Sequence, residues 1–256
     1  MVQYKPFYEL KNTAKDKLDG KYTGTILILL LSSLITNILT VFVDSVGSGT
    51  VNSVYYATES KAACNIVIFI FGVLLLTVHI ICAVMNAGIA LYFLNIACGQ
   101  PFALKNLFYG FRNDSKKSLA IAAVMVVCQT VCFGPFRYLA QNLLDTRDLK
   151  WLPYAAAAFF IGSCVYFPTA LGITLSFYLM LDFPQKSAGE TLSLCWRVMK
   201  GHKRRLFLLK LSFLPLILLC ILSFGVGFLW LDPYMQMTYT YFFLDLMNPK
   251  KEGETV

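Results

Sequence analysis

The residues best suited to chemistry in this 256-residue sequence are polar side chains set within apolar stretches. His79, Cys82 and Asn86 are separated by three and four residues, so they would share one face of a helix. Ionisable groups inside a membrane are costly and are by default functional. We therefore treat His79 and Asn86 as a candidate intramembrane site for a substrate or a proton. The simpler interpretation, a neutral histidine hydrogen-bonded to a neighbouring helix, stays open.

The sequence offers little for catalysis or for metal binding. Its two histidines, His79 and His202, belong to no His-x-x-x-His pair, nucleophile elbow or paired-carboxylate motif. No Gly-x-x-x-x-Gly-Lys-Ser/Thr loop is present, which argues against an ATPase. Cys128 and Cys132 lie one helical turn apart, but no histidine or carboxylate is near them in sequence, so they are better explained as small packing residues. We expect no enzyme, no metal site and no cofactor.

A second candidate site is a basic cluster that directly precedes a long apolar run. The cluster comprises Lys200, His202, Lys203, Arg204 and Arg205. The run from Leu211 to Leu231 contains no charged residue. As a helix it would span roughly 30 Å, the thickness of the hydrocarbon core. We expect the cluster to contact anionic phospholipid headgroups on the inner face, where each Lys or Arg contributes about 1 kcal/mol. A protein partner on that face is the alternative.

The elements that must position these residues are membrane-spanning helices. The chain is 57% hydrophobic and 14% charged, whereas a soluble domain is roughly half apolar and a quarter charged. Five apolar runs are long enough to cross a bilayer: 22–43, 62–98, 118–136, 151–181 and 206–231. The run 62–98 would measure about 55 Å, so it must tilt, kink or project. The sequence predicts an all-α polytopic integral membrane helical bundle that forms a single domain.

The distribution of basic residues predicts the orientation. Sixteen of the 22 Lys and Arg residues fall in 1–21, 99–117 and 182–210. By the positive-inside rule these segments are cytoplasmic, and so is the N-terminus, in a multi-pass protein of the cell membrane. The net charge of +8 is then a consequence of topology. It gives no support to a nucleic-acid partner.

The C-terminal segment conflicts with the positive-inside rule. Five spans leave 232–256 outside, and we predict an outer-surface helix followed by a tail. Lys250 and Lys251 then lie on the side that the positive-inside rule disfavours. A sixth crossing by 233–247 is the alternative, but the segment is short and contains Asp245.

Three amphipathic stretches are predicted as helices along the inner surface, each followed by a break and a basic pair. They lie in the same three basic segments, and 1–21 is the first of them. The third starts at a capping box, Ser187-x-x-Glu190. Tyr92 aligns with Tyr178 when 62–136 is superimposed on 151–231. This correspondence predicts an internal parallel repeat.

The stretch 182–234 carries a pattern that resembles a known family. The matching residues include Asp182, Pro184, Ser187, Glu190, Gly201, Pro233 and Tyr234, around the sequence Met-Lys-Gly-His-Lys. The pattern is similar to that of a family of bacterial multi-pass membrane proteins catalogued only as a domain of unknown function. Phe183 and Cys195 depart from it, where Asn and Ser are expected. The resemblance implies an integral membrane protein and no particular activity.

These observations favour a non-enzymatic membrane scaffold or accessory module. Its partner is the lipid bilayer, with an unidentified membrane protein or a second copy of the chain as further alternatives. The rival function is a transporter or export component for a small amphipathic substrate. Such a protein would use a cavity between the two repeats, around His79 and Asn86. A wide, polar-lined cavity open to one side favours the transporter, and a closed aliphatic interior favours the scaffold.

Overall fold

The computed structural model describes residues 2–58, 60–248 and 250–251, and helices make up nearly all of them. The elements are β1 (Val2–Gln3), α1 (Phe7–Leu18), α2 (Tyr22–Thr58), α3 (Lys61–Ala83), α4 (Met85–Ala97), η1 (Leu104–Phe108), α5 (Tyr109–Arg112), α6 (Ser115–Thr146), α7 (Trp151–Ile173), α8 (Ser176–Asp182), α9 (Ala188–Val198), α10 (Lys203–Leu211), α11 (Leu214–Leu222), α12 (Phe228–Met247) and β2 (Lys250–Lys251). The predicted all-α class is confirmed.

Five helical segments are long and apolar enough to cross a membrane, which is the number predicted. They are Tyr22–Thr58, Lys61–Ala97, Ser115–Leu144, Trp151–Asp182 and Lys203–Leu222. The predicted fifth span, 206–231, is not one helix, because α11 ends at Leu222 and the chain turns at Phe224 and Gly225, both with positive φ, before α12 begins at Phe228. The apolar side chains of the five segments face outward: Phe69 of α3 is 72% exposed and Phe160 of α7 is 70% exposed. Large apolar side chains exposed on helices of this length are typical of a surface that faces lipid.

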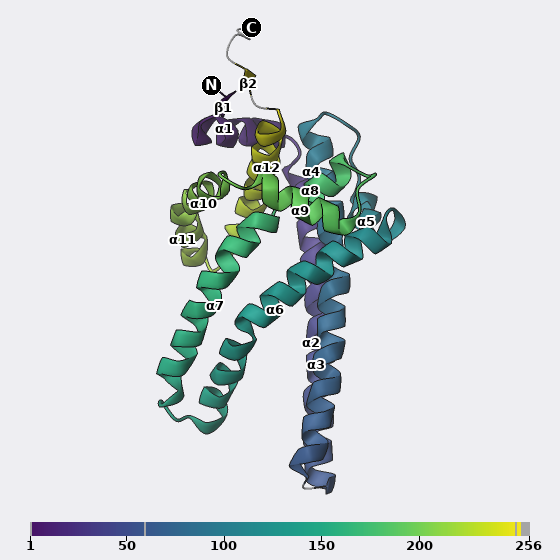
Figure 1. The fold of residues 1–256 in the computed structure, drawn as a ribbon, viewed down its shortest axis with the longest axis vertical. Coiled ribbons are helices and arrows are strands. Elements are labelled where there is room, and N and C mark those ends of the chain that lie inside the picture. Colours follow the sequence, from purple (N-terminus) through teal and green to yellow (C-terminus); the bar gives the residue numbers. More distant parts are fainter. Residues whose placement is uncertain (1, 59, 249, 252–256) are drawn as a thin grey trace.

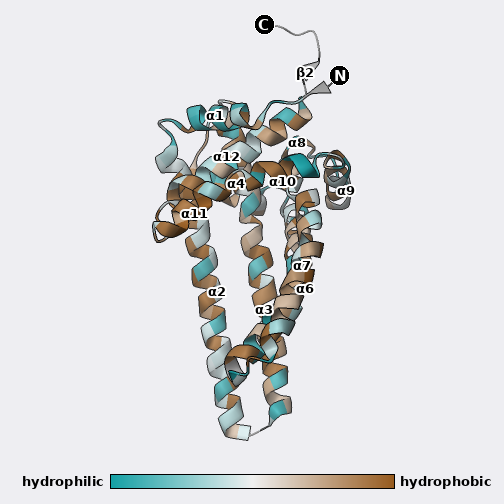
Figure 2. Ribbon diagram, turned by 90° about the vertical axis from the view of Figure 1, so that its left-hand side faces the viewer, coloured by the Kyte–Doolittle hydropathy of each residue, from teal (hydrophilic) through white to brown (hydrophobic). Residues whose placement is uncertain are grey.

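Two long hairpins, α2–α3 and α6–α7, extend toward one end of the molecule (Figure 1). The opposite end, which we call the terminal end, gathers α1, α4, α5, α8, α9, α10 and α12 together with both chain termini. The α11–α12 turn lies part of the way along the hairpins. Colouring by hydropathy shows α1 mostly hydrophilic and α11 hydrophobic (Figure 2). The terminal end therefore combines the hydrophilic helix α1 with packed core helices, and the hairpins carry much of the exposed apolar surface.

One helix of each hairpin is longer than its predicted span. The predicted span 22–43 continues as helix to Thr58, and 118–136 lies within a longer helix, Ser115–Thr146. Hydropathy predicts only the apolar part of a helix. Helix α2 continues beyond that part through polar residues, where α3 packs against it. The long apolar run 62–98 is divided at Val84 into α3 and α4.

The three predicted surface helices have different outcomes. Helix α1 forms as predicted, but its apolar face, Leu10, Ala14 and Leu18, is buried against other helices and α12 is its main neighbour. Helix α9 forms and begins at the predicted capping box. The middle segment forms a 3-10 helix, η1, and a single turn, α5, in place of one α-helix.

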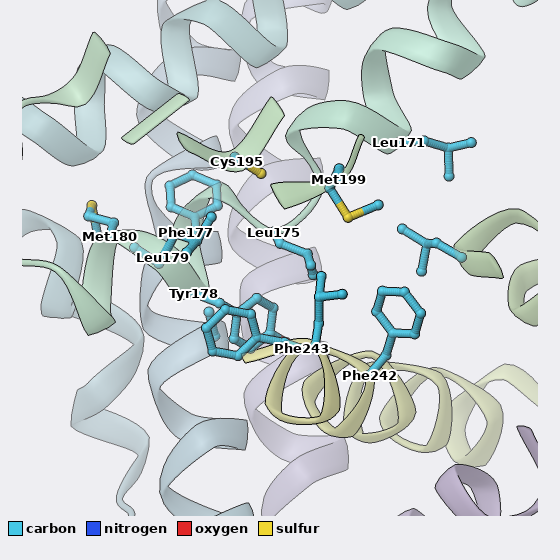
Figure 3. Close-up of a cluster of buried hydrophobic side chains, with 14 of the residues drawn as sticks. Leu171, Leu175, Phe177, Tyr178, Leu179, Met180, Cys195, Met199, Phe242 and Phe243 are labelled. Carbon is cyan, nitrogen blue, oxygen red and sulfur yellow. The ribbon is translucent and has the colours of Figure 1, made fainter. Parts of the chain in front are cut away.

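The centre of the terminal end is a cluster of buried side chains from α7, α8, α9 and α12 (Figure 3). Tyr178 of α8 stacks on Phe243 of α12, with ring centroids 5.2 Å apart. The Tyr178 hydroxyl forms a hydrogen bond with the hydroxyl of Thr240, 3.0 Å away. Cys195 of α9 and Met199, the residue after that helix, also pack in this cluster. Helix α12 is thus a central element of the core.

The prediction of an outer-surface helix for 232–256 is wrong for the residues that the structure describes. Helix α12 packs against α1, α2 and α4 and returns to the terminal end. Beyond it, Lys251 pairs with Val2 and Lys250 with Gln3 in an antiparallel two-residue ladder. The physical reason for the error is Asp245, whose charge argued against a buried helix but is neutralised by Arg205. The last residues, 252–256, lie outside the described part.

We expect cysteines placed at Val2 and Lys251 to form a disulfide bond on a cysteine-free background. Residues paired across a ladder have Cα atoms about 5 Å apart, which is within the range that a disulfide bridges. Oxidative cross-linking of the full chain in membranes, read as a mobility shift on gels, measures this. Cysteines at Val2 and Asp148 serve as the control, since Asp148 lies in the α6–α7 loop at the far end. Equal cross-linking of both pairs would contradict the fold.

Candidate functional site

The predicted basic cluster does not form one patch. The Arg205 side chain is 17% exposed and pairs with Asp245, whose side chain is 4% exposed, at 2.5 Å. Lys203 donates a hydrogen bond to the Pro168 carbonyl at 3.2 Å, and its ammonium lies 3.2 Å from the centroid of the Trp196 ring. Pro168 lies within α7, so this hydrogen bond joins the start of α10 to the C-terminal part of α7. Both cations hold helices together, which leaves them little freedom to contact lipid.

Arg205 is the centre of a contact network that we call the terminal clasp: Tyr4, Lys5, His202, Arg205 and Asp245. The guanidinium donates to the Lys5 carbonyl at 2.7 Å, and the Lys5 amide donates to Asp245 at 3.2 Å. The guanidinium carbon lies 4.9 Å from the Tyr4 ring centroid. The clasp therefore joins the N-terminal segment, α10 and α12.

His202 belongs to the clasp. Its Nε2 lies 3.4 Å from the Tyr4 hydroxyl, and the two rings meet edge to face. Burial lowers the pKa of His202 below its ordinary value, and the charge of Arg205 lowers it further. Its imidazole is therefore neutral near pH 7.

Lys200 and Arg204 are the two members of the predicted cluster that remain exposed. They line a groove of about 550 Å³ together with Lys203 and with Arg197, Ser193 and Trp196 of α9. Gly201, which the sequence motif contains, has a φ of 92° and lets the chain turn between α9 and α10. Lys200, Arg204 and the neighbouring Arg197 are therefore the exposed side chains available for the expected contact with lipid headgroups.

The motif around the α9 start has a structural role. Asp182 ends α8, and the chain passes Pro184 before the capping box. The Ser187 amide donates to the Glu190 carboxylate at 2.8 Å, and the Glu190 amide donates to the Ser187 hydroxyl at 3.3 Å. These hydrogen bonds lower the pKa of Glu190. The capping box is thus confirmed as the signal that starts α9.

The other two motif residues lie in α12. Pro233 is buried near the start of the helix, and the Tyr234 ring packs edge to face on Phe213, with centroids 5.4 Å apart. Phe213 lies at the break between α10 and α11. These two motif residues therefore take part in packing α12 into the core.

The predicted pair His79 and Asn86 does not form one site. His79 Nδ1 lies 2.8 Å from the Leu75 carbonyl of its own helix, so this nitrogen carries a proton and donates. Val84 separates α3 from α4, and Asn86 lies beyond this break. Asn86 faces a cavity that His79 does not line.

This cavity, which we call the intramembrane cavity, has a volume of about 440 Å³. Its walls come from the α3–α4 junction, α6, the α7–α8 junction, α10 and α12. The polar lining residues are Asn86, Gln129, Tyr166, Thr174, Tyr178, Lys210, Gln236 and Tyr239. Apolar lining residues such as Ile89, Met125, Leu171 and Phe177 lie between them. Asn86 and Gln129 are exposed, so the cavity is open on their side.

Lys210 is the lining residue that sequence reasoning missed. The sequence analysis assigns Lys210 to the basic cytoplasmic segment 182–210. In the structure this residue lies seven residues into the span Lys203–Leu222, about 10 Å along the helix. Its ammonium lies 5.5 Å from the Tyr239 ring centroid. Among the described residues it has neither an ion pair nor a hydrogen-bond acceptor. The available signal was a charge with leucine on both sides, at 209 and 211.

Residues 152–250 match the model of a family described as "Protein of unknown function (DUF975)". The resemblance seen in the sequence is therefore confirmed over this part of the chain. The matched segment supplies six of the polar residues of the cavity: Tyr166, Thr174, Tyr178, Lys210, Gln236 and Tyr239. No curated protein and no solved structure matches the chain.

Proposed function

We propose that this chain, which matches a family of unknown function over residues 152–250, binds a small amphipathic molecule within the membrane and acts in its transport or export. The observation that carries the proposal is the polar-lined, open cavity between α4, α6, α7 and α12. A scaffold would be expected to have a closed aliphatic interior. The volume of about 440 Å³ lies within the range of small-molecule sites.

Irregular turns in two spanning helices lie beside the cavity. One turn, at Val84, joins α3 to α4, and the other, at Thr174 and Leu175, joins α7 to α8, although helical backbone angles continue through Val84 and Thr174. Thr174 lines the cavity. In both halves of the predicted repeat, the long span therefore has an irregular turn at the cavity wall.

The proposal is non-enzymatic, because the sequence carries none of the catalytic motifs sought in it. It assigns the protein to the cell membrane with the terminal end in the cytoplasm. The return of α12 supports this orientation, since it adds Lys250 and Lys251 to the side that already carries most basic residues. Lys200 and Arg204 would contact anionic headgroups there.

Filling the cavity should abolish binding. We expect Ala170→Trp to weaken labelling of cavity residues by a photoreactive decanol at least about tenfold, because the indole occupies the space that the probe needs. The measurement is saturation labelling of the full chain in phosphatidylcholine nanodiscs, with labelled peptides identified by mass spectrometry. Ala156→Trp, on an exposed position of the same helix, is the matched control. Labelling confined to the outer faces of the hairpins in the parent protein would overturn the proposed function.

A further inference from the structure

We propose that the molecule in the intramembrane cavity carries an anionic oxygen head group, and that the ammonium of Lys210 binds it. This inference rests on the proposed function, because it requires the cavity to be a binding site. It names the class of ligand: an amphiphile with a carboxylate, sulfate or phosphate head and an apolar tail.

Most of the other partly buried cations among the described residues have oxygen acceptors supplied by the protein. Arg205 pairs with Asp245 through Nη2, although its buried Nη1 has no partner. Lys11, Lys117 and Lys203 donate to main-chain carbonyls, those of Ser212 at 3.0 Å, Phe183 at 2.9 Å and Pro168 at 3.2 Å. Lys21 and Lys186 contact only an aromatic ring, but both lie outside the apolar spans. A cation withdrawn from water without an acceptor is costly.

Lys210 is a partly buried cation within an apolar span that has no oxygen acceptor among the described residues. Its ammonium has the face of the Tyr239 ring nearby, at 5.5 Å from the centroid, but no oxygen acceptor. Asp232 lies one turn before Gln236 on α12, yet it forms no ion pair with Lys210. An aromatic ring offsets only part of the cost of withdrawing an ammonium from water. The missing acceptor is what an anionic head group would supply.

The rest of the lining fits such a ligand. Among the described lining residues there is no Asp or Glu, so a cationic head would find no countercharge and would be repelled by Lys210. Gln236 and Tyr239 offer neutral donors beside the ammonium. Leu171, Phe177 and Ile89 provide apolar surface for a tail. The cavity thus matches the two ends of an anionic amphiphile.

The test compares probes that differ in their head group. Photoreactive analogues of decanoate, decyl phosphate, decanol and decyltrimethylammonium are bound to the full chain in phosphatidylcholine nanodiscs, which contain no anionic lipid. We expect decanoate or decyl phosphate to reach half-maximal labelling of cavity residues at a concentration about tenfold lower than decanol does. The cationic probe should not label these residues. The two anionic probes also distinguish a carboxylate ligand from a phosphate ligand.

Substitution of Lys210 then separates its role in binding from a structural role. Lys210→Met should remove the preference for the anionic probes, and Lys210→Arg should keep it. Without ligand, Lys210→Met should raise the midpoint of thermal unfolding, because it removes an unpaired charge. Lys116→Met, at an exposed position that lines none of the described pockets, is the control and should change neither the preference for anionic probes nor the midpoint.

Three outcomes are decisive. Cavity labelling by decanol and decanoate to the same extent, unchanged by Lys210→Met, would overturn the anionic ligand and leave the proposed function standing. Failure of Lys210→Met to fold would also overturn the inference, since an unpaired charge should not be needed for stability. If none of the probes labels the cavity, the proposed function itself fails.

Discussion

Asp245→Asn should destabilise the folded protein by about 3–5 kcal/mol. The substitution removes the negative charge that compensates Arg205, and an unpaired charge among packed helices is strongly unfavourable. Both side chains are largely withdrawn from solvent, at 17% and 4% exposure, so solvent screening is weak. The free energy of unfolding would be measured in nanodiscs from the near-ultraviolet circular dichroism of the protein against temperature or denaturant.

A matched control uses the exposed ion pair of the α6–α7 loop. Asp148→Asn breaks the pair between Lys150 and Asp148, whose side chains are 86% and 43% exposed. Exposed pairs contribute little, so we expect a change within about 0.5 kcal/mol. The double variant Arg205→Met with Asp245→Leu should recover much of the loss, because neither charge remains to be compensated. If Asp245→Asn were as mild as the control, the terminal clasp would not hold the fold together.

Gly88→Ala should destabilise the protein by about 1–3 kcal/mol through overpacking. A Cβ at this position would overlap the main-chain carbonyl oxygens of Asn106 and Leu107, because α4 lies directly against η1. Main-chain atoms cannot move aside as a flexible side chain does, so α4 and η1 must separate. Thermal unfolding in nanodiscs again measures the effect.

The control for this substitution is Gly72→Ala on α3. Nothing lies within 4 Å of a Cβ at Gly72, so the change should be neutral or slightly stabilising, since alanine favours a helix. The displacement caused by Gly88→Ala should also reach the cavity, because Ile89 and Ala90 of the same helix form part of its wall. Equal midpoints for the two variants would contradict the close approach of α4 and η1.

Much of the fold could be predicted because its signals are local in the sequence. A stretch of apolar residues predicts a span from composition and length alone, and the five spans follow from this. The capping box joins Ser187 and Glu190, only three residues apart, so the start of α9 was visible without the tertiary structure. The ends of α2 and α6 were not predicted, because a helix can continue into polar sequence when a neighbouring helix packs against it.

The candidate site depended on contacts that no local pattern records. The basic cluster was recognised as a group, but whether each cation faces lipid or a partner inside the protein depends on which helices lie beside it. Arg205 and Asp245 are forty residues apart in sequence, and Lys5 is further still from both. The charge of Asp245 argued against burial of α12, but its ion pair with Arg205 lets the helix be buried.

The sequence by itself determined that this is an all-α membrane protein with a strongly basic side, because hydropathy and charge act through the solvent and need no knowledge of neighbours. Only the tertiary structure decided that α12 returns to the terminal end and that Asn86 and Lys210 share a cavity without His79. A helix has several faces, and its own residues do not specify which face meets which partner. The packing of α4, α6, α7, α10 and α12 made that selection, and with it formed the site.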